Sequence, residues 1–309
     1  MAKKVLLTGA TGFIGRRLLT RLLEKGHQVR AVSRRPPAAL DLPAHPNLEL
    51  YQGDALDASA LPEMLEGMDA AFYLIHSMEG GVGNEELFVE RDRQAALNFS
   101  RAAKQANLSQ VIYLSGLEPK EEVSKHLRSR NDVEIYLGEH GVPVTVLRAG
   151  FIIGPGSAGF SMLQGIVGQM RTMMISRELH HKTQPAFVED VVEALATCLE
   201  HPEVTAGETF ELGSKEVVEY FDIVRDFCAC AGREVNFIEV PWVPQKIAAT
   251  YIASVSGLPF ALVAALAEGL NIDLFVENER LYELFPHIHR TSPAEAMRFA
   301  FREITAAAE

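Results

Sequence analysis

Three glycines spaced three residues apart, Gly9, Gly12 and Gly15, follow the apolar run Val5-Leu6-Leu7 near the start of the chain. Glycine permits tight turns and lets backbone N–H groups approach a ligand without a Cβ in the way. Between a strand and a helix, this spacing is typical of a loop that binds the diphosphate of a dinucleotide at the positive end of the helix dipole. We therefore expect NAD or NADP to bind here. The residues expected to contact it are Gly9, Thr11, Gly12, Phe13 and Ile14.

The residues that follow the glycines support this interpretation. Ile14, Leu18 and Leu22 recur at helical spacing, and Gly26 ends the helix predicted over 13–25. Residues 27–32 then read as a second strand. A glycine-rich turn without a ligand is the alternative, and the strand–loop–helix–strand context argues against it.

The end of this second strand bears on the choice between NAD and NADP. A protein selective for NAD usually places Asp or Glu there, because a carboxylate accepts hydrogen bonds from the ribose. This chain has Ser33, Arg34 and Arg35, and no acid before Asp41. A guanidinium can bind a 2′-phosphate through two charge-assisted hydrogen bonds, so the sequence favours NADP. The alternative is that both arginines are solvated loop charges.

Apolar strands and amphipathic helices alternate over the first two thirds of the chain. Further strands are predicted over 48–52, 70–75, 110–114 and 143–147, with helices over 58–65, 85–105 and 124–139. This alternation predicts an α/β fold, a Rossmann-type doubly wound parallel sheet covered by helices on both faces.

Ligands of such sheets bind beyond the carboxyl ends of the strands. The further cofactor contacts expected there are Gly53 and Asp54 after the third strand, His76 and Ser77 after the fourth, and Gly150 and Phe151 after the sixth. Ser115 ends the fifth strand at the same edge. Asp54 could equally be a simple turn residue.

These features together resemble the short-chain dehydrogenase/reductase superfamily, in particular its extended and atypical members, which are NmrA-like or similar to nucleoside-diphosphate-sugar epimerases. The resemblance covers roughly residues 1 to 215. It rests on the glycine motif at 8–15, Tyr113-Leu114-Ser115, the stretch 144–150 leading to 154–156, and the motif at 185–191. It implies an NAD(P)-binding core followed by a smaller, mainly helical substrate domain.

The domain organisation expected from this resemblance has two parts. We expect the Rossmann core over residues 1–155 and a mixed C-terminal region over 156–309. That region should return to the core around 183–200, and its part at 205–309, including a strand at 208–212, should face the substrate.

The chain departs from the superfamily at the catalytic pair. Catalytic members carry Tyr followed four residues later by Lys, and none of the seven tyrosines here has Lys at that offset. Aligning through Glu134 places His126 and Arg130 at the two positions, one helical turn apart. The resemblance implies that Ser115 polarises a substrate carbonyl.

The chemistry of the replaced pair differs from that of Tyr and Lys. The neighbouring guanidinium disfavours the charged form of His126, so this histidine should be neutral and a poor proton donor. A neutral His126 could still accept a proton or orient the substrate. Arg130 could hold the cofactor in place of Lys. The alternatives are that His126 is a polar helix residue without a catalytic role and that Ser115 is a routine turn residue.

Methionines gather beyond the predicted sheet, at Met162, Met170, Met173 and Met174. Flexible thioethers suit an adaptable apolar pocket, although filling a core is the more frequent use of methionine. We expect Met78, Met162 and Met170 to line a pocket for an apolar substrate.

No charged residue occurs from Ile247 to Ala267. Ser254, Gly257 and Pro259 interrupt this stretch, so two short buried helices joined at 257–259 fit better than a transmembrane span. An apolar substrate pocket, a subunit interface and shallow membrane contact remain open as alternatives.

Composition excludes several classes of function. The chain has 309 residues, 48% of them hydrophobic, and a net charge of -12, which disfavours nucleic acid as a partner. The N-terminus leads straight into the first strand, so we expect no signal peptide and a cytoplasmic protein. Three cysteines form no disulfide framework. His180, His181, His287 and His289 lack convergent further ligands, so no metal site is expected.

Two functions remain. The first is an NADP-dependent oxidoreductase, a monomer or homodimer, that moves a hydride between nicotinamide and a small apolar carbonyl, enone or quinone. The second is a non-catalytic NADP(H)-binding redox sensor or scaffold, as NmrA-like relatives suggest. Loss of the Tyr and Lys pair favours the second function. The glycine loop and the methionine-rich flank favour the first, which we prefer.

Overall fold

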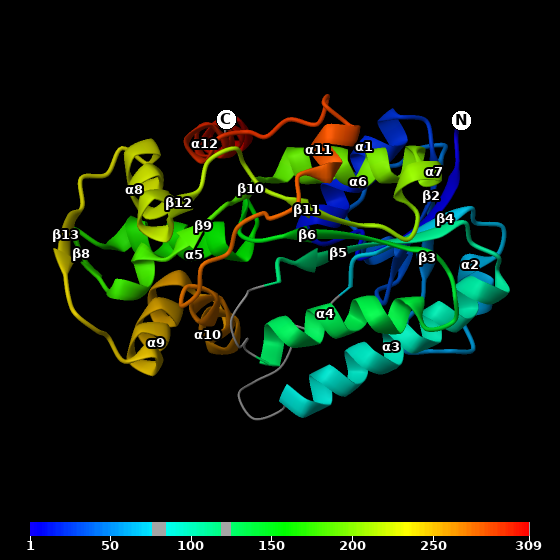
Figure 1. Ribbon diagram of the computed structural model, residues 1–309, viewed down its shortest axis with the longest axis horizontal. Coiled ribbons are helices and arrows are strands. Elements are labelled where there is room, and N and C mark those ends of the chain that lie inside the picture. Colours follow the sequence, from blue (N-terminus) through cyan, green and yellow to red (C-terminus); the bar gives the residue numbers. More distant parts are fainter. Residues whose placement is uncertain (76–84, 119–124, 309) are drawn as a thin grey trace.

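A central parallel sheet organises the molecule, with helices on both of its faces and a group of further elements at one end (Figure 1). The computed structural model describes the backbone of residues 1–75, 85–118 and 125–308, and the side chains of these residues except 85–88, 125–130 and 307–308. All statements below concern these residues.

The sheet has seven strands in the order β11-β6-β5-β4-β1-β2-β3, and every neighbouring pair is parallel. This arrangement confirms the predicted α/β fold with a doubly wound parallel sheet. The strands are β1 Lys4–Thr8, β2 Gln28–Ser33, β3 Leu48–Gln52, β4 Ala70–Tyr73, β5 Gln110–Gly116, β6 Val144–Ala149 and β11 Thr209–Leu212.

Helices bury both faces of the sheet, which explains why its strands read as nearly continuous apolar runs. Helices α1 (Phe13–Glu24) and α6 (Val188–Glu200) cover one face, while α2 (Leu61–Leu65), α3 (Glu85–Gln105) and α4 (Lys125–Gly138) cover the other (Figure 1). We call the apolar side chains packed between these helices and the strands the sheet core. Its fully buried members include Leu7, Leu22, Leu195, Phe99 and Val111.

The remaining elements pack around a separate C-terminal core, whose buried residues include Phe160, Leu163, Phe227, Val263 and Met297. Its helices are α5 Ala158–Gln169, α8 Tyr220–Cys230, α9 Gln245–Ser256, α10 Phe260–Gly269 and α12 Pro293–Ala308. Short strands pair as β7 (Ile152–Ile153) with β10 (Ala186–Phe187), β9 (Lys182–Thr183) with β12 (Val218–Glu219), and β8 (Thr172–Ile175) with β13 (Asn236–Glu239). The other short helices are η1 Pro37–Ala39, η2 Arg177–His180, α7 Pro202–Thr205 and α11 Arg280–Leu284.

One strand lies elsewhere than expected. The strand predicted at 208–212 in the substrate-facing part is β11, and it pairs in parallel with β6 at the edge of the central sheet. That part of the prediction is wrong, because Phe210 and Leu212 are buried in the sheet core. The pattern of four residues identifies a strand but not its partner. The domain boundaries themselves stay a prediction.

The uncharged stretch 247–267 forms the two helices that were predicted, α9 and α10. Gly257 ends α9 with φ +70°, a left-handed conformation that glycine adopts without strain. The expected burial is only partly correct, because Ala249 and Val263 are buried whereas Ile247 and Tyr251 are exposed. Among the residues that the structure describes, no helix combines the length and apolar character needed to cross a membrane.

Candidate cofactor site

The glycine loop lies at the point where the chain reverses direction across the sheet. From β1 the chain builds β2 and β3 on one side, then crosses to β4 on the other side of β1. Loops that leave such a switch point in opposite directions open a crevice that binds ligands. Gly9, with φ +71°, packs so closely against the end of β4 that a Cβ there would overlap the Leu74 carbonyl oxygen. The loop therefore packs directly against the end of β4, at the switch point where folds of this type bind ligands.

Gly12 and Gly15 shape the start of helix α1. The Gly12 N–H donates to the Gly9 carbonyl oxygen at 2.9 Å, and a Cβ on Gly15 would overlap that same oxygen. In the described part of the chain, no side chain caps the first N–H groups of α1, and its first turn contains no acid. These N–H groups and the helix dipole can therefore receive an anion such as a diphosphate.

Thr8, which the sequence analysis did not single out, joins β1 to β4 where the two strands separate. Its hydroxyl donates to the Phe72 carbonyl oxygen at 3.0 Å and accepts from the Leu74 N–H at 3.0 Å. The side chain is 2% exposed. Thr8 thus continues the hydrogen bonding of the sheet up to the glycine loop. The sequence signal that could have identified this role is a hydroxyl residue directly before the first glycine of the loop.

The Phe13 ring packs against a second loop rather than standing in the open. Cβ atoms built on Gly154 and Gly156 would lie 3.1 and 3.6 Å from this ring, so the glycines make room for it. The Arg17 guanidinium lies 5.0 Å from the ring centroid and donates to the Pro155 carbonyl oxygen at 3.2 Å. The Phe13 side chain therefore ties the glycine loop to residues 154–156. Contact of Phe13 and Ile14 with the cofactor stays a prediction.

The turn after β2 presents two arginines at the same edge of the sheet. The Ser33 hydroxyl accepts from the Arg35 N–H at 3.1 Å, and the Ser33 carbonyl accepts from the Gly53 N–H at 2.9 Å. The side chains of Arg34 and Arg35 are exposed. These backbone contacts fix the turn that carries the two arginines, and contact of Ser33, Arg34 or Arg35 with the cofactor stays a prediction.

Gly53 and Asp54 follow β3 beside this turn. A Cβ on Gly53 would lie 2.7 Å from the Met64 sulfur, so a larger residue would require the Met64 side chain to move. Asp54 Oδ1 accepts from the Leu56 N–H at 3.0 Å, which is the turn geometry given above as the alternative. Contact of either residue with the adenine stays a prediction.

Ser115, at the carboxyl end of β5, is 2% exposed. Its hydroxyl lies 3.5 Å from Asn131 Oδ1 on helix α4, at the limit of hydrogen bonding. Asn131 was missed in the sequence, although it directly follows Arg130. Gly150 and Phe151 follow the neighbouring strand β6, and a Cβ on Gly150 would lie 3.3 Å from Leu117 Cδ1. These loops lie at the same edge of the sheet as the glycine loop.

An ion pair fixes helix α4 against β6. Arg148 Nε and NH2 donate to the two carboxylate oxygens of Glu134 at 3.1 and 2.7 Å, and NH1 donates to Glu118 at 2.7 Å. The side chain of Glu134 is 11% exposed. The hydrogen bond to Glu134 raises the pKa of Arg148, so the guanidinium stays charged. Helix α4 places His126 and Arg130 two turns and one turn before Glu134.

Several predicted site residues cannot be placed. His76, Ser77 and Met78 lie outside the described residues. The backbone positions of His126 and Arg130 belong to α4, but their side chains also lie outside the described part.

The two described methionines of the predicted substrate pocket lie in or against the C-terminal core. Met162 is 8% exposed within it, and Met170 packs against it. This is the core-filling role noted above as the alternative. Their contact with a substrate stays a prediction. Among the described side chains, no group of three or more His, Cys, Asp or Glu is arranged to hold a metal ion.

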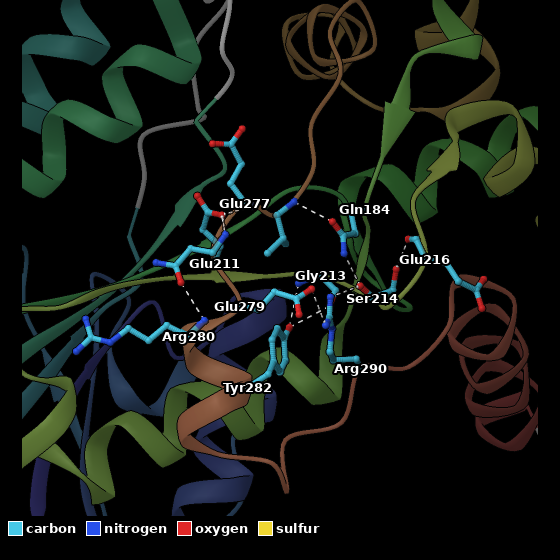
Figure 2. A network of polar contacts seen from close by, with 12 residues as sticks. Gln184, Glu211, Gly213, Ser214, Glu216, Glu277, Glu279, Arg280, Tyr282 and Arg290 are labelled. Atoms are coloured by element: carbon cyan, nitrogen blue, oxygen red, sulfur yellow. Dashed lines mark hydrogen bonds and ion pairs between the residues drawn. The ribbon is translucent and has the colours of Figure 1, made fainter.

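A polar network holds the C-terminal segment at the carboxyl end of β11 (Figure 2). The Tyr282 hydroxyl lies 3.0 Å from both the N–H and the carbonyl oxygen of Gly213. Arg290 packs over the Tyr282 ring at 4.6 Å and donates to the Ser214 carbonyl oxygen at 3.0 Å. Gln184 donates to the same oxygen at 2.6 Å. Helix α11 and the segment after it therefore border the edge of the sheet that carries the site.

Comparison with known proteins agrees with this geometry. A family model described as NAD(P)H-binding matches residues 9–178, which is more than half of the chain. The match begins within the glycine loop and runs beyond β6.

Curated relatives include dehydrogenases. A 3 beta-hydroxysteroid dehydrogenase/Delta 5-->4-isomerase of Mycobacterium tuberculosis is 36% identical over 121 residues, which cover 36% of this chain and 31% of the relative. The match thus spans about a third of that relative's length. A 3-beta-hydroxysteroid dehydrogenase of Mycolicibacterium neoaurum is 25% identical over 270 residues, covering 77% of this chain and 72% of the relative.

Solved structures share the fold over nearly the whole chain. Triphenylmethane reductase of a Citrobacter species has a TM-score of 0.76 at 18% identity, covering 97% of this chain and 99% of its own. UDP-glucose 4-epimerase of Thermotoga maritima has a TM-score of 0.75 at 16% identity, covering 99% and 100%. The family model, which matches more than half of the chain, establishes that the chain belongs to the NAD(P)H-binding family, and the solved structures share its doubly wound fold.

Proposed function

We propose that this protein is an NADP-dependent oxidoreductase that transfers a hydride between nicotinamide and a small apolar carbonyl, enone or quinone. The glycine loop packed against the end of β4, at the start of α1, carries the proposal. A backbone cradle that admits no Cβ at Gly9 or Gly15 fits a bound diphosphate. The dehydrogenase and reductase names of its relatives support oxidoreduction.

The residues at the carboxyl ends of β5 and β6 would position the substrate. When bound, the reduced cofactor supplies the hydride. The Ser115 hydroxyl, which lies 3.5 Å from Asn131 Oδ1, would turn its single O–H from this contact to the substrate carbonyl. His126 would orient the substrate or accept a proton, and Arg130 would hold the cofactor. The steroid dehydrogenases among the relatives favour an apolar substrate.

A screen for NADPH consumption tests the reaction. We expect the purified protein to oxidise NADPH with at least one aldehyde, enone, quinone or steroid ketone, as followed by NADPH absorbance. His126→Ala should lower turnover by about 10-fold or more, because acid–base or orienting groups typically contribute at least this much. The dissociation constant of NADPH should stay the same.

The screen also distinguishes the second candidate function. Lack of the Tyr and Lys pair favours a sensor or scaffold, which would bind NADPH and consume it with none of these substrates. Binding without consumption across the whole panel would replace the oxidoreductase by this function.

Arg34 tests the choice of cofactor. We expect Arg34→Gln to weaken NADPH binding by about 10- to 100-fold, because a hydrogen bond to a charged group contributes about 1.5–3 kcal/mol. NADH, which lacks the 2′-phosphate, should bind as before. Isothermal titration calorimetry with both cofactors measures the effect, and Arg225→Gln on the exposed face of α8 is the control. Equal NADPH affinity in both variants would contradict the assignment.

A further inference from the structure

Arg16 connects two segments that border the expected ribose position. It lies in the first turn of α1, and its side chain turns back over the glycine loop. Nε donates to the Thr11 carbonyl oxygen at 3.3 Å, and NH1 donates to the Asp41 carbonyl oxygen at 2.8 Å. NH1 also lies 3.6 Å from the Asp41 carboxylate. One guanidinium therefore joins the glycine loop to the chain that follows Arg35 and η1.

The position of Arg16 bears on cofactor selection because it adjoins the segments that contact the adenosine ribose in a doubly wound sheet. The ribose lies between the glycine loop and the end of β2, where a carboxylate selects the 2′-hydroxyl and an arginine selects the 2′-phosphate. Asp41 is the first acid after β2 in the sequence. An unpaired carboxylate there would repel a 2′-phosphate. Arg16 is the partner that the structure gives to this carboxylate.

The contact between Arg16 and Asp41 can be exchanged for a stronger one. The side chain of Asp41 is fully exposed and that of Arg16 is 44% exposed. An ion pair of 3.6 Å between two such groups is weak in water. A phosphate carries more charge than a carboxylate and accepts two parallel hydrogen bonds from a guanidinium. Turning NH1 toward a phosphate would break its 2.8 Å hydrogen bond to the Asp41 carbonyl oxygen as well as this ion pair, while Nε could keep its contact with Thr11.

We propose that Arg16 is a specificity-determining residue for the 2′-phosphate monoester of NADP, acting from the glycine-loop side while Arg34 acts from the end of β2. It neutralises Asp41 before the cofactor binds and contacts the phosphate afterwards. The inference rests on the proposed NADP dependence and adds a residue that the glycine motif and the β2 turn do not identify. A purely structural clamp between Thr11 and Asp41 would hold the loop equally well for NADH and NADPH.

The test compares the dissociation constants of NADPH and NADH, measured by calorimetry on the full chain. We expect Arg16→Gln to weaken NADPH binding by about 10-fold while NADH binding changes by less than about two-fold, as for loss of one charge-assisted contact. Arg16→Lys should retain part of the preference because it keeps the charge. Arg21→Gln, on the same helix but paired with Glu24 and Glu193, should leave both constants unchanged.

A second variant separates selection from loop structure. Asp41→Asn in the wild-type background should leave NADPH binding intact or tighten it, because it removes only the repelling charge. Loss of NADPH affinity in Asp41→Asn would identify the Thr11–Arg16–Asp41 connection as structural and overturn the inference. Equal weakening of NADPH and NADH in Arg16→Gln, or no change in either, would also overturn it.

Failure of the inference differs from failure of the proposed cofactor. Wild-type protein that binds NADH as tightly as NADPH, with no effect of Arg34→Gln, contradicts the NADP dependence itself. Wild-type protein that prefers NADPH and loses this preference in Arg34→Gln but not in Arg16→Gln contradicts only the role of Arg16.

Discussion

Gly15→Ala is expected to abolish dinucleotide binding and to lower the free energy of unfolding by about 2–3 kcal/mol. A Cβ at this position would overlap the Gly9 carbonyl oxygen and lie 2.8 Å from the Gly9 carbonyl carbon and 2.9 Å from Ala10 Cα. All three atoms belong to the backbone, so no side-chain rotation can relieve the overlap. The glycine loop would have to move away from α1, which would displace the N–H groups that face the diphosphate.

A matched control is available in helix α5. A Cβ on Gly168 would meet no atom within 4 Å, so Gly168→Ala should stabilise the protein by up to about 1 kcal/mol through helix propensity. Urea unfolding and calorimetric titration with NADPH measure both variants. NADPH binding of wild-type strength in Gly15→Ala would show that this loop does not hold the cofactor.

Arg148→Met is expected to destabilise the protein by about 3 kcal/mol, because it leaves the Glu134 carboxylate unpaired where only 11% of that side chain is exposed. The same pair holds α4 against β6, and α4 carries Asn131 beside Ser115. We therefore expect the turnover of Arg148→Met, measured without denaturant, to fall more than its affinity for NADPH does. Chemical unfolding and steady-state kinetics measure the two effects.

An exposed pair on α3 provides the comparison. Glu90→Gln removes an ion pair to Arg93 in which both side chains are substantially exposed, and it should cost less than about 1 kcal/mol. Equal losses in Arg148→Met and Glu90→Gln would mean that burial does not strengthen the Glu134 pair. Arg148→Lys should recover part of the stability but not all of it, since lysine cannot make the two parallel hydrogen bonds.

The sequence predicts the fold where local pattern and tertiary structure agree. The bounds of β3 and α3 match the predicted 48–52 and 85–105, because apolar periodicity there reflects burial on the faces of the sheet. Strand β11 was placed in the wrong part of the molecule, since its four residues carry no information about the strand that they join. The pairing with β6 depends on residues more than fifty positions away.

The candidate site divides in a similar way. Gly9, Gly12 and Gly15 were predictable because a short loop imposes its own spacing on the chain. Asn131 and Arg16 were not, because each meets its partner only after helices and loops have packed. Phe13 belongs to the predicted motif, yet its ring packs on residues 154–156, which no local pattern could indicate.

The interleaving of the two cores constrains how the molecule can move and be divided. The sheet core draws on residues 5–149, 186–212 and 281–288, whereas the C-terminal core draws on 153–175, 220–263 and 296–300. Since the polypeptide passes back and forth between them, no contiguous segment of the chain contains either core without part of the other. Each crossing of the chain is also a covalent connection between the cores. A hinge motion between the cores would therefore have to bend all of these connecting segments at once. We expect the two to melt as a single cooperative unit.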